Sequence, residues 1–196
     1  TDKTVEIATN FGANVVEFNW DGRFPKKRNW VLRSYEFSTE WVLFLDADEV
    51  VNETFCEELL NAIKHREYVG FWLNYTNYFM GKQLKYGVQQ RKLACFNIGE
   101  GEYERIDEEG WSALDMEVHE HPILRGATGE IQAPIDHRDF RGLARFLERH
   151  IDYAKWESAR YRQMKMRSKF GFSELTNRQR FKYGNIEKSW FAWFYF

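Results

Sequence analysis

The stretch that most limits the possible folds is residues 41–51, Trp-Val-Leu-Phe-Leu-Asp-Ala-Asp-Glu-Val-Val. Its first five residues are large and apolar without alternation, a pattern typical of a strand that is covered on both faces. We therefore predict a central strand of a parallel sheet with helices on each side. Asp46 and Asp48 follow at its carboxyl end, which is the edge where open α/β sheets bind ligands.

The two aspartates are separated by one small residue, so a turn after Leu45 would let their oxygens converge on one point. Such a pair suits Mg²⁺ or Mn²⁺, which take oxygen ligands and leave positions open for substrate phosphates. We expect the next acid, Glu49, to face a helix amino end or solvent. An equally good interpretation is that these acids only end a strand and cap the next helix.

The order of elements along the chain predicts an α/β fold. Apolar periodicity and turn residues indicate helices over residues 3–11, 29–37, 52–65 and 141–169. Strands are expected over residues 14–18, 69–79, 91–96 and 131–135, and a polar loop over 99–112. Pro134 predicts that the last strand lies near a sheet edge or an end. We divide the chain into a domain of residues 1–140 and a carboxyl-terminal helix and tail of residues 141–196.

A basic cluster, Lys26-Lys27-Arg28-Asn29, stands at the start of the second predicted helix. Cationic side chains beside the backbone N–H groups of a helix amino end suit a diphosphate. A solvated basic face is the alternative interpretation, and the cluster alone favours it.

The segment 116–122 is a second candidate site, because it carries two glutamates and two histidines in an extended stretch. If the segment is a strand, Glu117, His119 and His121 share one face and Glu120 points to the other. A carboxylate here could act as a general base. A surface strand with ordinary polar residues is the alternative. His137, in a third polar cluster, could be a metal ligand or a hydrogen-bonded loop histidine.

Composition narrows the function classes. A net charge of -2 gives no electrostatic case for a nucleic-acid partner. Cys56 and Cys95 are far apart and lack metal-ligand spacing, so they indicate neither a disulfide framework nor a zinc site. We predict that both are small residues of the core. No apolar run is long enough to span a bilayer. The cations and aromatic residues of 178–196 suit a membrane interface, with packing onto the domain as the alternative. Since the chain begins with a helix, we expect that a first strand is missing and that the chain is a fragment.

These clusters together resemble the GT-A glycosyltransferases of family 2, and within that family the bacterial enzymes that glucosylate the lipopolysaccharide core. The residues that carry the resemblance are the opening 1–4, Lys27-Arg28-Asn29, Leu45-Asp46-Ala47-Asp48, Val118-His119-Glu120 and Pro134-Ile135-Asp136-His137. The resemblance implies a nucleotide-diphospho-sugar transferase fold: a mostly parallel central sheet flanked by helices, with a helical extension at the carboxyl end.

The resemblance also implies roles for residues. Asp48 and His137 would be ligands of the metal, Mg²⁺ or Mn²⁺. Glu120 would be the base that deprotonates the acceptor hydroxyl. The set expected at the donor nucleotide is Lys27, Arg28, Asn29 and Asp46. The implied reaction is inverting transfer from a nucleotide-diphospho-sugar, expected to be a UDP-sugar, to a glycan or lipid-linked acceptor. The implied location is cytoplasmic and peripheral at the inner membrane, where the protein would contact an anionic membrane surface.

Two other functions compete with this hypothesis. A non-catalytic module could keep the fold and bind the nucleotide sugar without turning it over. A metal-dependent phosphohydrolase could use the same carboxylates, although no second metal cluster is evident in the sequence.

Overall fold

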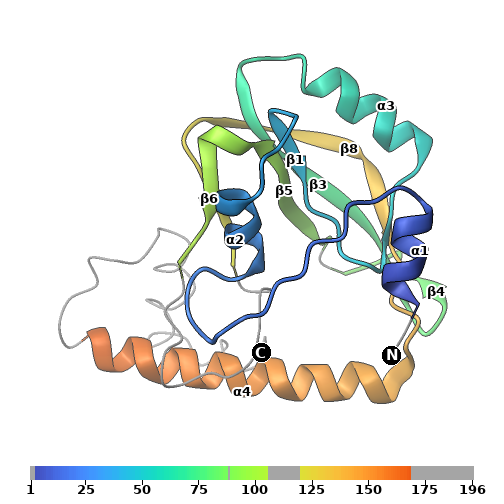
Figure 1. Ribbon diagram of the computed structural model, residues 1–196. Helices are drawn as coiled ribbons and strands as arrows, with labels where there is room; N and C mark the ends of the chain where they lie inside the picture. Colours follow the sequence, from blue (N-terminus) through green and yellow to red (C-terminus); the bar gives the residue numbers. More distant parts are fainter. Residues whose placement is uncertain (1–2, 88, 106–119, 169–196) are drawn as a thin grey trace.

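The computed structural model describes residues 3–87, 89–105 and 120–168, and its side chains as far as residue 162. Figure 1 shows a curled central sheet with α3 above it and the long α4 running along the bottom. The helices are α1 (Thr4–Asn10), α2 (Lys27–Ser34), α3 (Glu53–Ala62), the short η1 (Ile98–Glu100) and α4 (Gly142–Ser168). The strands are β1 (Trp41–Leu43), β2 (Glu49–Val50), β3 (Tyr68–Phe79), β4 (Lys82–Gln83), β5 (Arg91–Asn97), β6 (Gly101–Tyr103), β7 (Pro122–Leu124) and β8 (Ala127–His137).

The main sheet is mixed, which corrects the prediction of a mostly parallel sheet. Among the described strands the order is β1-β5-β3-β8-β2, with β4 paired to β3. Only β3 and β8 run parallel, and the other pairs are antiparallel. The fold therefore contains both helices and strands, as an α/β fold does, but most neighbouring strands of the sheet are antiparallel.

The apolar run at residues 41–51 is not a central strand. Trp41, Val42 and Leu43 pair with β5 alone among the described strands, and all three are only half-buried. The centre of the sheet is β3 instead, which lies between β5 and β8. A short apolar run does not reveal whether both faces of the strand are packed against other elements. The prediction of a central strand was wrong for this reason.

The core lies between β3, β8 and α3. Phe55 of α3 is fully buried against Leu73 of β3 and Ile131 and Ile135 of β8. Helix α3 begins as predicted, because the Asn52 side chain accepts a hydrogen bond from the Phe55 N–H at 2.8 Å. The partly buried positions Leu59, Ala62 and Ile63 complete the packing.

Strand β8 is longer than predicted, and its edge is closed in two ways. Strand β2 pairs only with Asp136 and His137 of β8. Farther along, the Glu58 carboxylate of α3 accepts hydrogen bonds from the backbone N–H groups of Gln132 and Ala133, at 2.7 and 2.8 Å. Pro134 thus falls where no strand pairs on that side, which agrees with its predicted place near an edge.

Other local predictions had mixed outcomes. Residues 14–18 form no strand, and part of the predicted polar loop 99–112 folds as η1 and β6. The helices predicted over 3–11, 29–37 and 141–169 are present within a few residues. Cys95 is buried, but Cys56 is exposed, so the core prediction was wrong for Cys56. The segments 106–119 and 169–196 lie outside the described residues, with most of the 116–122 site and the whole basic-aromatic tail.

Candidate functional site at the end of the sheet

The two aspartates lie in a tight turn between β1 and β2. The chain leaves β1 after Leu43, and the N–H of Glu49 donates to the carbonyl of Asp46 at 2.9 Å. Strand β2 then pairs Glu49 with His137 of β8. This pairing brings Asp48 next to the end of β8, because the turn and the end of β8 are held in register.

Asp46 is surrounded by cations. Its carboxylate contacts Arg28 Nη2 at 3.0 Å and Lys92 Nζ at 2.8 Å. Burial acts to raise the pKa of Asp46, but the hydrogen bonds and charges of Lys92 and Arg28 outweigh it and hold the pKa below its usual value. Asp46 is therefore an anion whose charge is balanced by two cations, Lys92 of β5 and Arg28 of α2.

Glu49 does not face a helix or solvent, so that expectation was wrong. Its side chain is 1% exposed and forms a close ion pair with Lys92. Its other oxygen accepts the N–H of Asp46 at 3.0 Å. Burial acts to lower the pKa of Lys92, but the carboxylates of Asp46 and Glu49 outweigh it and raise the pKa. Lys92 thus ties the acidic turn to β5.

Asp48 has a different set of partners from Asp46. Its Oδ1 lies 3.6 Å from His137 Nε2, and its Oδ2 accepts from Arg141 Nη2 at 2.9 Å. The Asp48 carbonyl accepts the N–H of Arg138 at 2.7 Å. His137 is oriented by Asn77, whose Oδ1 lies 3.3 Å from His137 Nδ1. A proton on Nδ1 leaves the lone pair of Nε2 on the side of Asp48.

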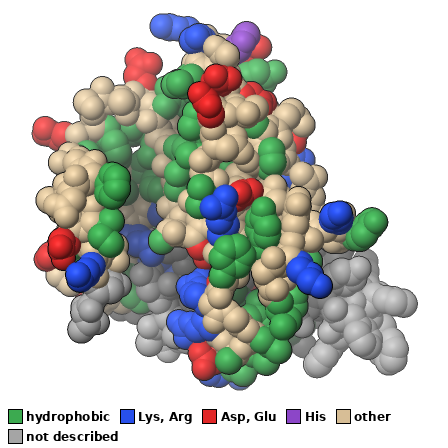
Figure 2. Space-filling view, turned by 90° about the vertical axis from the view of Figure 1, so that its right-hand side faces the viewer, with side chains coloured by type: hydrophobic (Ala, Val, Ile, Leu, Met, Phe, Trp, Pro, Cys, Tyr) green, Lys and Arg blue, Asp and Glu red, His purple; other side chains and the backbone are tan. Residues whose placement is uncertain are grey.

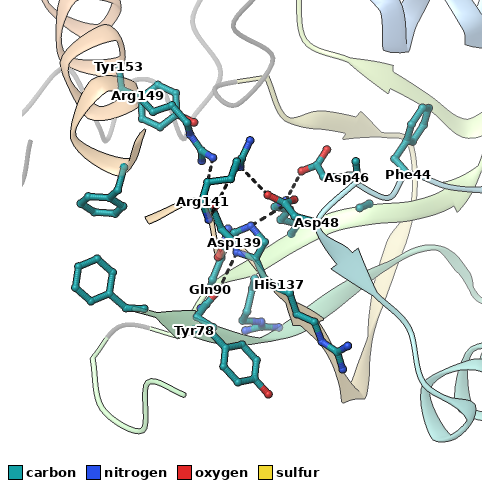
Figure 3. Close-up of a pocket in the computed structure, with 18 of the residues that line it drawn as sticks. Phe44, Asp46, Asp48, Tyr78, Gln90, His137, Asp139, Arg141, Arg149 and Tyr153 are labelled. Atoms are coloured by element: carbon teal, nitrogen blue, oxygen red, sulfur yellow. Dashed lines mark hydrogen bonds and ion pairs between the residues drawn. The ribbon is translucent and has the colours of Figure 1, made fainter. Parts of the chain in front are cut away.

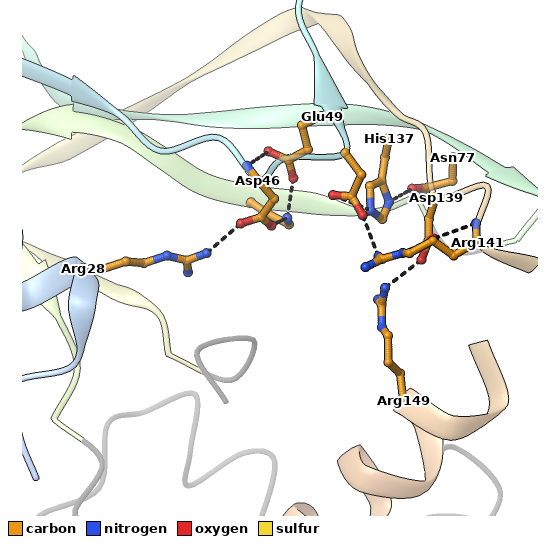
Figure 4. A network of polar contacts seen from close by, with 10 residues as sticks. Arg28, Asp46, Glu49, Asn77, His137, Asp139, Arg141 and Arg149 are labelled. Carbon is orange, nitrogen blue, oxygen red and sulfur yellow. Dashed lines mark hydrogen bonds and ion pairs between the residues drawn. The ribbon is translucent and has the colours of Figure 1, made fainter. Parts of the chain in front are cut away.

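Asp139 connects this group to α4. It accepts from Arg141 Nε at 2.8 Å and from Arg149 Nη1 at 2.7 Å. The hydrogen bond from Arg141 lowers the pKa of Asp139 to about 2, against the opposing effect of burial. Figure 4 shows two groups of contacts: one joins Arg28, Asp46 and Glu49, and in the other Arg141 and Asp139 lead to Arg149.

The basic cluster at α2 divides into different environments. Arg28 reaches Asp46 and also lies over the ring of Tyr103, 5.1 Å from its centre. Asn29 is 1% exposed, and its amide donates to the Tyr103 carbonyl at 2.8 Å and accepts the Tyr103 N–H at 2.9 Å. Asn29 therefore fixes α2 to β6, whereas Lys27 is exposed at the cavity described next.

Glu120, the candidate base, is buried beside a cation. Its Oε1 lies 3.5 Å from Lys26 Nζ, and both side chains are less than 5% exposed. A buried carboxylate needs such a partner, because an unpaired charge there would be strongly destabilising. Its predicted neighbours Glu117 and His119 lie outside the described residues.

One cavity of about 1290 Å³ joins these groups. Its wall includes Lys27 and Arg28, both aspartates of the turn, Lys92, Glu120, His137, Asp139, Arg141 and Arg149. Figure 3 shows Arg149 and Tyr153 reaching from α4 toward Arg141 and Asp48, with Asp46 and Phe44 beyond them. Acids that are far apart in the sequence therefore do meet in a shared cleft.

The donor set in this cavity fits a metal that is shared with a substrate. Within residues 3–87, 89–105 and 120–168, no three His, Cys, Asp or Glu side chains are grouped as a complete metal site. Asp48 and His137 offer one carboxylate and one imidazole next to each other, with Asp48 Oδ1 and His137 Nε2 3.6 Å apart. Mg²⁺ and Mn²⁺ are commonly held by one or two protein ligands together with substrate phosphates and water.

Three cationic residues of the site were missed by the sequence analysis: Lys92, Arg141 and Arg149. Lys92 lies 46 positions from Asp46, and nothing local to β5 marks it. The sequence analysis gave the polar residues of 141–169 no role. Arg141 lies just before α4, so helical spacing does not connect it with Arg149, and no local pattern marks the pair.

The fold brings the acidic turn and the surrounding cations to one cavity, where guanidinium and ammonium groups suit an anionic, phosphorylated ligand. The sequence profile of glycosyl transferase family 2 matches residues 1–132, about two thirds of the chain, so the chain belongs to this family. Its activity class is therefore glycosyl transfer from a nucleotide sugar to an acceptor. No curated protein matches the chain, and no solved structure does.

Proposed function

We propose that this protein is a metal-dependent, inverting glycosyltransferase that acts in the synthesis of a cell-surface glycan, such as a lipopolysaccharide core. The observation that carries the proposal is the single cavity that unites Asp48, His137 and Glu120 with the cations of α2, β5 and α4. A family 2 chain whose acids and cations line one cleft can bind a diphosphate and a hydroxyl nucleophile in the same space.

On the donor side, Asp48 and His137 would hold Mg²⁺ or Mn²⁺, which would neutralise the charge that develops on the leaving nucleoside diphosphate. Arg28 and Lys27 lie at the amino end of α2 and would bind the diphosphate oxygens. Asp46 would hold Arg28 in place, since its carboxylate already accepts the guanidinium at 3.0 Å. Asn29 keeps the helix at this position through Tyr103.

On the acceptor side, Glu120 would take the proton of the attacking hydroxyl. The acceptor oxygen would form a bond to the anomeric carbon from one face, while the bond to the diphosphate oxygen breaks on the other. The electron pair of that bond leaves with the nucleoside diphosphate, so the configuration at the anomeric carbon inverts. Lys26 balances the charge of Glu120 before the proton arrives.

The test is turnover of UDP-sugars with Mn²⁺ or Mg²⁺, with a glycan acceptor. Replacing Asp48 by Asn or Glu120 by Gln should each lower kcat by at least about 100-fold, as expected for loss of a metal ligand or a general base. The matched controls are Asp152→Asn and Glu102→Gln, because both acids form exposed ion pairs away from the cavity. Full activity in both Asp48→Asn and Glu120→Gln would reject these roles.

A second function, nucleotide-sugar binding without transfer, has one observation in its favour. Both aspartates of the turn are already paired with cations of the chain itself. Calorimetric binding of a UDP-sugar without release of nucleotide, across a panel of acceptors, would favour this binding function over catalysis.

We also propose that the protein contacts an anionic membrane at its surface, where a lipid-linked acceptor would be found. Leu143, Leu147 and Ile151 are about half exposed and recur every fourth residue, so they lie on one face of α4. Figure 2 shows hydrophobic side chains gathered low on the face where β4 and the start of α4 lie. Among the described helices, none has the length and apolar character needed to cross a bilayer.

A further inference from the structure

The carboxylate expected to bind the metal already has a cation on it. Arg141 Nη2 donates to Asp48 Oδ2 at 2.9 Å, on the oxygen next to the one that faces His137. A divalent ion at Asp48 and His137 would bring two positive charges beside this guanidinium. Because like charges at such a separation repel, Arg141 and the metal compete for Asp48.

The surroundings of Arg141 allow its side chain to move away from Asp48. Its side chain is 50% exposed, and it stands just before Gly142, whose φ of +84° lies in the left-handed region at the start of α4. An exposed arginine can change its rotamer, and in doing so Arg141 would give up its hydrogen bond to Asp139 at 2.8 Å as well as the one to Asp48. The site does not collapse without it, because Asp139 keeps its second partner, Arg149, at 2.7 Å.

The place to which Arg141 can turn is the cavity itself. Arg28, Arg141 and Arg149 all line it, so an anionic ligand between α2 and α4 would be within the reach of guanidinium groups from both helices. Arginine forks match phosphate oxygens in a bidentate manner. The negative charge of a diphosphate would also compensate the added charge of the metal.

We propose that Arg141 couples donor binding to metal binding by exchange: it neutralises Asp48 when the cavity holds no ligand, and it moves to the donor diphosphate when the nucleotide sugar and the divalent cation bind. This role rests on the proposed function, and it makes Arg141 a residue that binds the donor. The exchange keeps Asp48 paired at every stage and makes each ligand favour the other.

The test uses two separate titrations of the purified protein, Mn²⁺ without nucleotide and UDP at saturating Mn²⁺. Arg141→Gln should bind Mn²⁺ about fivefold more tightly and UDP about fivefold more weakly, the size expected when a half-exposed ion pair is lost or gained. Arg141→Lys keeps the charge, so its Mn²⁺ affinity should stay close to that of the wild type. The control is Arg145→Gln, since Arg145 pairs with Glu148 one turn farther along α4 and should change neither affinity.

Opposite signs in the two titrations are the signature of exchange, because a variant that merely disturbed the fold would weaken both ligands. Equal Mn²⁺ affinity in Arg141→Gln and the wild type, or weaker binding of both ligands, would overturn the exchange. Failure of the wild-type protein to bind UDP at all would instead reject the proposed function. The two failures are therefore distinguishable.

Discussion

Replacing Lys92 by Met should be one of the most destabilising changes at the surface of the cavity. The ammonium group holds two carboxylates, Asp46 at 2.8 Å and the closely paired Glu49. Asp46 is 44% exposed and keeps its ion pair with Arg28, so losing its contact with Lys92 should destabilise the fold only slightly. Glu49 is 1% exposed, and without Lys92 no other cation in the described part of the chain lies within ion-pair distance of it, although its carboxylate keeps the N–H of Asp46.

Breaking a buried pair by removing one partner costs about 3–5 kcal/mol. Because Glu49 retains one hydrogen bond and Lys92 itself is 31% exposed, we expect the lower end of that range, about 3 kcal/mol. Urea denaturation followed by circular dichroism measures this loss. The double variant Glu49→Gln/Lys92→Met should recover about 2 kcal/mol, since no charge then remains buried.

The matched control is Lys155→Met, because Lys155 forms an exposed ion pair with Asp152 on α4. It should change the free energy of unfolding by less than about 0.5 kcal/mol. The reasoning is refuted if Lys92→Met costs less than about 1 kcal/mol, or if the double variant is no more stable than Lys92→Met alone.

Three further predictions concern separate parts of the molecule. Replacing Asn52 by Ala removes the side-chain cap of α3 and should cost about 1 kcal/mol in thermal or urea unfolding, whereas Asn61→Ala, near the other end of the helix, should cost less. The pKa of Asp139 is lowered to about 2, so its ion pairs stabilise the fold above about pH 4 and are lost as the pH falls through 2. The stability gap between wild type and Asp139→Asn, about 1 kcal/mol at pH 6, should therefore close between pH 4 and pH 2, and a gap that widened on acidification would contradict this. In flotation assays the protein should rise with vesicles that contain anionic lipid, and Leu147→Ser/Ile151→Ser should weaken that binding; protein that stays in the pellet would count against membrane contact.

The parts of the fold that the sequence predicted well are those determined locally. Asn52 is followed by a helical apolar pattern, and the cap and α3 appear where expected. Strand β3 was likewise predicted, because aromatic and polar residues alternate along it. The acidic turn followed from the sequence for the same reason, since Asp46 and Glu49 close it within four residues.

The parts that failed depend on partners that are distant in the sequence. The run 41–45 is apolar, yet among the described strands β1 pairs with β5 alone. Hydrophobicity does not say how many neighbours a strand has. Glu49 was expected to face a helix amino end or solvent, but Lys92, 43 positions away, makes its burial tolerable. The pairing of Asp48 with Arg141 spans 93 positions and left no signal in the local pattern.

The most direct test of the central claim is the position of a bound Mn²⁺ ion. Crystals of the protein soaked with Mn²⁺ and UDP should give an anomalous peak between Asp48 and His137, with the Arg141 side chain turned away from Asp48 toward the diphosphate. A peak at another site, or UDP bound outside the cavity with Arg141 still on Asp48, would contradict the account.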